Sequence, residues 1–87
     1  MKKAKVSVII PAYNASQYLG RALDSVLGQD IDTEIIVIDD ASDDPIDQLI
    51  EKYKSCPKLL YVKNQKNLGV AASRNLGVTL SQGDYVA

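Results

Sequence analysis

Residues 35–42, Ile-Ile-Val-Ile-Asp-Asp-Ala-Ser, constrain the fold of this chain more than any other stretch. Four apolar residues, mostly β-branched, predict a strand that is buried on both faces, as in the middle of a parallel sheet. Asp39 and Asp40 follow at the end where a strand of an open α/β sheet leaves the core and where ligands bind. Because successive side chains on a strand point to opposite faces, we expect different roles for the two carboxylates. The alternative interpretation is that both only begin the next turn, through hydrogen bonds with the backbone.

Similar runs recur along the chain and alternate with helical patterns. Residues 6–10 and 59–62 predict two more strands, and residues 84–87 predict the start of a fourth. Apolar residues return at helical spacing from 18 to 27 and from 46 to 53, and a third helix is predicted from Gly69 to about Leu80. The order βαβαβαβ predicts a Rossmann-like α/β fold, in which helices flank a parallel sheet with right-handed crossovers.

Proline, glycine and capping residues predict where these elements begin and end. Pro11 cannot donate to a ladder, so we expect it to end the first strand. Ser16 has the side chain of a helix cap, and Gly28 suits the left-handed residue that often follows a helix. Asp44 as cap, with Pro45 at the first helical position, predicts the start of the second helix.

The third helix and the fourth strand bear on how the domain is organised. The helix is rich in small residues, which predicts close packing on the sheet; these are Ala71, Ala72, Ser73 and Gly77. Residues 1–87 form one domain at most. A parallel strand of residues 84–87 would be an unusually short, exposed edge, so we expect the sequence to be the N-terminal piece of something longer.

The composition argues against several classes of function. Ten Lys and Arg against 11 Asp and Glu give a net charge of −1, which argues against a nucleic-acid-binding protein that neutralises phosphates. One cysteine, Cys56, excludes an intrachain disulfide. Without histidine, acid–base or metal chemistry would have to use carboxylates. We expect no signal peptide, because the lysines at the start are followed by a strand pattern.

A nucleotide site is the first expectation for such a sheet, although the familiar phosphate loops are missing. Neither Gly-x-Gly-x-x-Gly nor Gly-x-x-x-x-Gly-Lys-Ser/Thr follows the first strand. The loop offers instead Tyr13, an aromatic face suited to a base or sugar, and Asn14, an amide. With Asp40 nearby, a carboxylate could accept a hydrogen bond from a base N–H while the ring packs alongside. A carboxylate repels phosphate, so the phosphates would need a cation from elsewhere.

Five stretches carry a resemblance to a known family, in order and at the usual spacing. They are Val-Ser-Val-Ile-Ile-Pro-Ala-Tyr-Asn at 6–14, residues 18–29, Glu-Ile-Ile-Val-Ile-Asp-Asp-Ala-Ser-Asp-Asp at 34–44, residues 67–77 and Gly-Asp-Tyr-Val at 83–86. Each is weak alone, but together they resemble the family 2 glycosyltransferases over nearly the whole chain. The resemblance implies a GT-A fold that binds a nucleoside-diphosphate sugar and passes the sugar to an acceptor hydroxyl.

The resemblance implies roles for particular residues. Pro11, Ala12 and Tyr13 would line the nucleoside pocket, with Tyr13 against the base. Asp40 would hydrogen-bond the base, most often uracil, so the expected donor is a UDP-sugar. Arg74, on the third helix, would reach the donor.

Other parts of the family pattern are missing. The Asp-x-Asp motif that holds Mg²⁺ or Mn²⁺ and the catalytic base would both follow Ala87. We therefore expect neither metal ligands nor catalytic residues in this chain, which would be inactive alone. Asp39 is expected to support the strand end and Asp84 a turn. Helix capping accounts for Asp43, Asp44 and Asp47, so we do not expect them to form a substitute metal cluster.

Members of the family act on saccharide, lipid and protein acceptors, and the resemblance does not choose among them. It implies a cytoplasmic protein and leaves open a membrane attachment through other segments. Two alternatives remain. A non-catalytic, receiver-like module is one, although receivers carry their acidic pair after the first strand, where this chain has residues 11–13. The other is a folding unit that self-associates through its open strand edge.

Overall fold

The computed structural model describes residues 5–29 and 31–87, so Asp30, in the predicted connection to the second strand, lies outside the described residues. Seven elements follow one another in alternation, which confirms the predicted α/β fold. They are β1 (Val6–Ala12), α1 (Ser16–Leu27), β2 (Thr33–Asp39), α2 (Ile46–Glu51), β3 (Leu59–Lys63), α3 (Val70–Leu80) and β4 (Tyr85–Val86).

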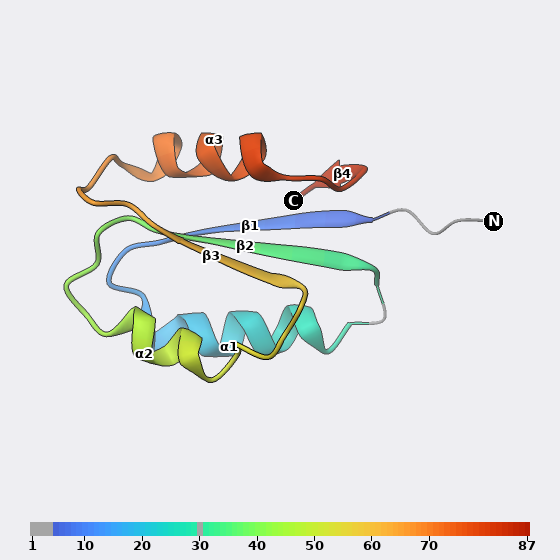
Figure 1. The fold of residues 1–87 in the computed structure, drawn as a ribbon, viewed down its shortest axis with the longest axis horizontal. Coiled ribbons are helices and arrows are strands. Elements are labelled where there is room, and N and C mark those ends of the chain that lie inside the picture. The colour runs from blue at the N-terminus through green and yellow to red at the C-terminus, as the bar shows by residue number, and fades with distance from the viewer. Residues whose placement is uncertain (1–4, 30) are drawn as a thin grey trace.

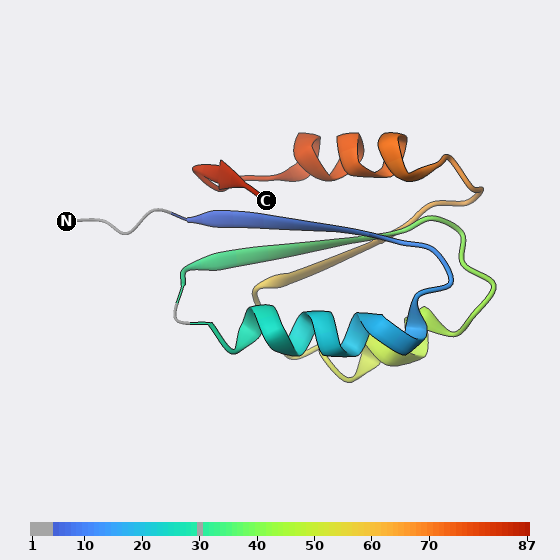
Figure 2. The same ribbon diagram turned by 180° about the vertical axis from the view of Figure 1, so that it is seen from behind.

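The four strands form one parallel sheet with the order β3-β2-β1-β4. Helices α1 and α2 cover one face of this sheet, and α3 covers the other (Figures 1 and 2). The strand order reverses between β1 and β4, because the chain passes from the β3 edge back across the sheet. In open α/β sheets the carboxyl ends of the strands beside such a reversal are where ligands bind.

Strand β2 is the centre of two apolar cores, as its sequence predicts. Ile35 and Val37 pack in the core under α1 and α2, together with Ala12, Leu19, Leu23 and Ile46. Ile36 and Ile38 pack in the core under α3, together with Ile9 and Leu76. All four β2 side chains are at most 1% exposed. Each such burial contributes about 1.5–3 kcal/mol, so this one strand anchors both layers.

Helix α3 lies close to the sheet at Gly77. A Cβ atom there would lie 2.4 Å from Ile9 Cγ2, well inside van der Waals contact. Ser73 and Gly77 are buried against the sheet, whereas Ala71 and Ala72 are exposed. The small-residue prediction is therefore right for one face of the helix only.

The prediction that Pro11 ends the first strand is wrong, because β1 continues to Ala12 and Pro11 pairs in register with Ile38. The Ile9 N–H points toward the β4 side, where it donates to the Ala87 carbonyl, and the Ala12 carbonyl points toward β2. Alternation places the nitrogen of Pro11 on the β4 side, beyond the Val6 and Ser7 pairs that β4 makes. Within the described residues, the missing N–H of Pro11 therefore costs no hydrogen bond between strands.

Three predicted helix ends are also corrected. Ser16 is not a cap: it is the first residue of α1, its N–H donates to Asp44 Oδ2 at 2.9 Å, and Ala15 occupies the cap position. Asp44 does not cap α2 with its side chain, and Pro45 is the residue before that helix rather than its first. Gly28 ends α1 at φ −78°, in the right-handed region. The capping carboxylate of α1 therefore comes from a different loop.

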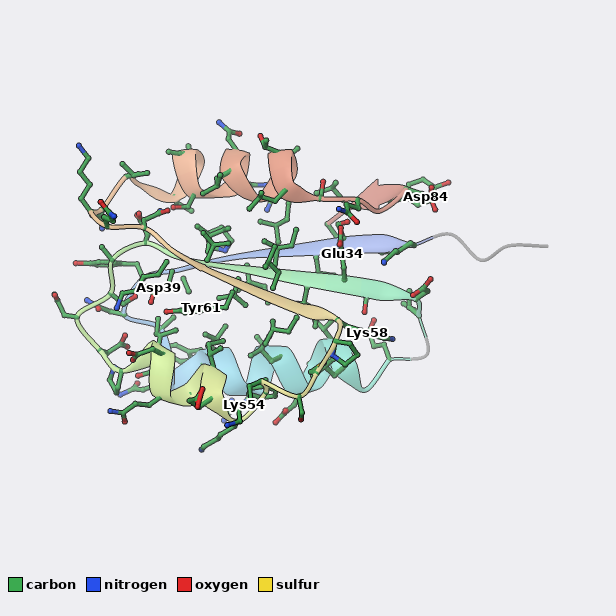
Figure 3. The ribbon with its side chains drawn as sticks, in the orientation of Figure 1. Glu34, Asp39, Lys54, Lys58, Tyr61 and Asp84 are labelled. Atoms are coloured by element: carbon green, nitrogen blue, oxygen red, sulfur yellow. The ribbon has the colours of Figure 1, made fainter. Side chains whose placement is uncertain are left out.

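The short strand β4 is held by polar contacts at the amino end of the sheet and spans only Tyr85–Val86 of the predicted 84–87. Ser7 Oγ donates to Glu34 Oε1 at 2.5 Å and accepts from the Gly83 N–H at 2.8 Å. Glu34 Oε1 also accepts from the Gln82 N–H. Figure 3 shows Glu34 and Asp84 on the α3 side of the sheet, and Asp84 Oδ2 accepts from the Lys5 N–H at 2.9 Å.

Candidate functional site

Three loops meet at the carboxyl edge of the sheet, at the left in Figure 1. They follow β1, β2 and β3 at residues 13–15, 40–45 and 64–69. The Asp40 N–H donates to the Ala12 carbonyl at 2.8 Å, and the Asn64 N–H donates to the Asp39 carbonyl at 2.8 Å. These bonds fix the beginnings of two of the loops and bring their side chains to one rim.

Asp39 supports the end of β2, as predicted. It is 1% exposed, and its two oxygens have separate partners. Oδ1 accepts from the Ser42 N–H at 3.0 Å, and Oδ2 accepts from the Tyr61 hydroxyl at 2.5 Å (Figure 3). Burial, and then this bond, raise the pKa of Tyr61. The pair holds the turn in which Ala41 takes φ 59°, a left-handed conformation that side chains other than glycine rarely adopt.

Asp40 faces the beginning of α3 and is 4% exposed. Its Oδ1 accepts from the Leu68 N–H at 2.7 Å and from Asn64 Nδ2 at 2.9 Å. Its Oδ2 accepts from the Gly69 N–H at 2.8 Å. The Leu68 N–H and then the Asn64 amide lower the pKa of Asp40, because both favour the charged form. A carboxylate has about four acceptor positions, so these three bonds leave capacity for one more at Oδ2.

Asn14 joins the loop after β1 to the loop after β2. Its backbone takes φ 50° and its N–H donates to Ser42 Oγ at 3.0 Å. Its Oδ1 accepts from the N–H groups of Asp43 at 2.8 Å and Asp44 at 3.4 Å. The amide that the sequence offered as a ligand contact therefore holds two loops together.

The predicted site residues do not all present side chains to this rim. Pro11 is half-buried within β1, and Ala12 is 1% exposed and packs in the core under α1. Tyr13 directly follows β1 and is 51% exposed, so its ring is available to a ligand. Arg74 is exposed on α3. Among residues 5–29 and 31–87 the one ion pair joins Lys54 to Glu51, so Arg74 pairs with no described carboxylate.

Two hollows open at the same edge and share Asn64 and Gln65 in their walls. One, of about 540 Å³, also has Lys66 and Leu68; the other, of about 450 Å³, also has Lys63, Ala41 and Ser42. Asn64 lies between the predicted third strand and third helix, and the sequence assigned it no role. The signal available was its position directly after a strand, equivalent to that of Asp40 after β2.

The described carboxylates at this rim are not gathered into a cluster of potential metal ligands. No group of three or more His, Cys, Asp or Glu suitable for a metal occurs in the described part of the chain. Both oxygens of Asp39 and of Asp40 already accept hydrogen bonds, and Asp44 Oδ2 accepts from the Ser16 N–H. A divalent cation on a diphosphate would therefore need other ligands. None of the described helices has the length and apolar character of a membrane span.

Comparison with known proteins gives concordant matches. The family model described as Glycosyl transferase family 2 matches residues 7–87. Cholesterol galactosyltransferase of Borreliella burgdorferi is 40% identical over 97% of this chain and 24% of its own length. Chondroitin synthase of Escherichia coli is 41% identical over 93% of this chain and 12% of its own length.

Solved structures match the fold as well. The crystal structure of S. aureus TarS 1-349 in complex with UDP-GlcNAc has a TM-score of 0.86 at 34% identity, over 94% of this chain and 25% of the other. Mannosyltransferase PcManGT from Pyrobaculum calidifontis, in complex with GDP-Man and Mn²⁺, has a TM-score of 0.87 at 26% identity, over 99% of this chain and 27% of the other. The chain therefore spans about a quarter or less of the length of these relatives.

Proposed function

The chain belongs to glycosyl transferase family 2, and we propose that it forms the donor-nucleoside part of an enzyme that moves a sugar from a nucleoside diphosphate to an acceptor hydroxyl. The observation that carries this proposal is the Asp40 carboxylate. It is held at the carboxyl edge of the sheet after β2, one strand away from the strand-order reversal between β1 and β4, and three hydrogen bonds leave one acceptor position for a base N–H.

The expected donor is a UDP-sugar. TarS, 34% identical, was crystallised with UDP-GlcNAc and with UDP. A carboxylate as acceptor suits uracil, whose N3–H is a donor. We propose that the half-exposed ring of Tyr13 packs on the base and that Arg74, free of described carboxylates, reaches the diphosphate. Pro11 and Ala12 would support Tyr13 as the last residues of β1.

The acceptor is not assigned to this segment. The name of one relative above indicates a sterol and the name of the other a polysaccharide. Both are nevertheless about equally identical to this chain. We therefore assign the shared segment to the donor side of the reaction. Cytoplasmic location and self-association through the sheet edge stay predictions, and size-exclusion chromatography tests the second.

A divalent cation is part of the proposal, with its ligands outside the described residues. The mannosyltransferase relative was crystallised with Mn²⁺, and Mg²⁺ or Mn²⁺ would balance the charge of the diphosphate. Since the described residues hold no group of carboxylates suited to a metal, we expect chelation of metal from the parent protein to abolish sugar transfer and to leave uridine binding unchanged. Loss of uridine binding on chelation would contradict this division.

Calorimetric titration of the parent protein with UDP tests the site. Tyr13→Ala should weaken UDP binding about 5- to 150-fold, because stacking of one base on an aromatic ring is worth about 1–3 kcal/mol. Tyr18→Ala is the matched control, since Tyr18 is 68% exposed on α1. Asp40→Asn should also weaken UDP, whereas Asp43→Asn, in the same loop, should not. Equal affinity in all four variants and the wild type would remove the assigned pocket.

A further inference from the structure

Asn64 connects Asp40 to two other elements of the fold. It directly follows β3 and is 8% exposed. Its Nδ2 donates to Asp40 Oδ1 at 2.9 Å and to Ser73 Oγ at 3.2 Å, and its backbone N–H donates to the Asp39 carbonyl at 2.8 Å. Ser73 is fully buried on α3. One side chain thus links the strand end of β3, the acidic pair after β2 and the helix above them.

The orientation of the Asn64 amide follows from charge. An ionised carboxylate only accepts hydrogen bonds, so the nitrogen of the amide, and not its oxygen, must face Asp40. The two amide hydrogens are used by two acceptors, Asp40 Oδ1 and Ser73 Oγ. Because Ser73 is buried in a helix packed on the sheet, the amide cannot turn without leaving the carboxylate without this partner.

Asn64 differs in kind from the other partners of Asp40. The Leu68 and Gly69 N–H groups belong to the backbone and bind one oxygen each. Asn64 donates from its side chain, and it binds Oδ1, the oxygen already engaged by Leu68. Two donors on Oδ1 and one on Oδ2 set the rotation of the carboxylate, and this rotation decides where the remaining acceptor position of Oδ2 points.

We infer that Asn64 is a positioning residue for base recognition: it holds the Asp40 carboxylate in the rotation at which Oδ2 accepts the N3–H of uracil. This inference deepens the proposed function and rests on it. The amide acts through Asp40 and touches neither the base nor the sugar. Its removal should therefore affect the preference for a base that can donate, and not binding of the nucleotide in general.

The test compares UDP with N3-methyl-UDP, in which the donor hydrogen is replaced, by calorimetry on the parent protein. The wild type should bind UDP more tightly. In Asn64→Leu, of similar size but without donors, UDP affinity should fall about three- to tenfold, while the affinity for N3-methyl-UDP should change by less than about twofold. Gln65→Leu is the matched control: it removes a neighbouring amide that lines the same hollows. Its preference for UDP should equal that of the wild type.

Ser73→Ala, a milder change, should reduce the preference by a smaller factor, and it serves if Asn64→Leu does not fold. A ligand-free readout is the pH titration of the Asp40 carboxyl carbon by NMR. The Asp40 pKa should rise in Asn64→Leu and stay at the wild-type position in Gln65→Leu.

The outcomes separate this inference from the proposed function. A wild type that binds both nucleotides equally would overturn base reading by Asp40, and with it the role of Asn64. A wild type that prefers UDP, with the same preference in Asn64→Leu and Ser73→Ala, would overturn the inference about Asn64 alone. Equal weakening of both nucleotides, or an unchanged Asp40 pKa, would show that the amide is only structural.

Discussion

Replacing Gly77 by alanine should destabilise the protein, although the same change favours most helices. The added Cβ would lie 2.4 Å from Ile9 Cγ2 and 3.2 Å from Ile9 Cγ1. Ile9 is 5% exposed and enclosed by β2 and α3, so it cannot move away without disturbing the core. Overpacking of this kind costs about 1–3 kcal/mol. The higher helix propensity of alanine offsets about 0.5–1 kcal/mol of that cost.

The expected net loss is therefore up to about 2.5 kcal/mol in the free energy of unfolding, or up to about 20 °C in Tm for a domain of this size. Urea and thermal unfolding followed by circular dichroism measure both quantities. Gly20→Ala is the matched control. Gly20 lies inside α1, and a Cβ there would meet Leu49 Cδ1 at 3.4 Å, an ordinary contact. This variant should be more stable than the wild type by about 0.5–1 kcal/mol.

A double variant separates the clash from other causes. Ile9→Ala removes the atoms that the new Cβ would meet, at a cost of about 2–5 kcal/mol by itself. In that background Gly77→Ala should be neutral or stabilising. If Gly77→Ala costs as much in the Ile9→Ala background as in the wild type, or if it stabilises the wild type as Gly20→Ala does, the close approach of α3 to β1 is not what glycine provides here.

Three further predictions concern loops and pH. Ala41→Gly should stabilise the protein by about 0.5–1 kcal/mol in urea unfolding, because Ala41 takes φ 59°; a loss would contradict strain at this turn. Asp44→Ala should cost about 1 kcal/mol in the same assay, since the Ser16 N–H at the start of α1 loses its acceptor; no change would mean that water replaces the carboxylate. The pKa values of Glu34 and Asp40 are lowered in the folded protein, so the stability they contribute is present above their unfolded values of 4.5 and 3.8 and is lost as the pH falls through the folded values. Acid titration of the unfolding free energy should therefore show a decline below about pH 4.5 that is shallower in Glu34→Gln; an equal slope in both proteins would exclude Glu34 as a source.

The fold could be predicted because its main determinants are local. Four apolar residues at 35–38 fill both cores, so their run without polar interruption indicates a central strand. The ends of the helices and strands were harder to predict, because the groups that bind them are distant in the sequence. The Ser16 N–H is bound by a carboxylate 28 positions away, and no capping rule based on neighbouring residues can find it. Pro11 is tolerated in β1 because its nitrogen faces the β4 side of the strand. Which strand lies on that side depends on the order of strands in the sheet.

The candidate site was predicted in part, for the same reason. Two adjacent aspartates after a buried strand indicated two roles, and Asp39 has the structural one. The surroundings of Asp40 are tertiary: Asn64 and Ser73 come from different elements and meet only when α3 packs on the sheet. The positions of Asn64 and Ser73 in the sequence do not mark them as partners of Asp40. Only the packed helix makes them partners of a carboxylate.

The way β4 is fastened has a consequence for synthesis on the ribosome. The bonds from Lys5 to Asp84 and from Gly83 to Ser7 span 79 and 76 positions, the longest separations among the side-chain bonds of the described residues. Translation runs from the N-terminus, so β1, β2 and β3 are synthesised before residue 84 exists. During that interval β1 is an edge strand without a partner on its β4 side, so it can pair with a strand of another chain. How long the edge of β1 stays unpaired therefore depends on the rate of elongation as well as on the stability of the finished sheet.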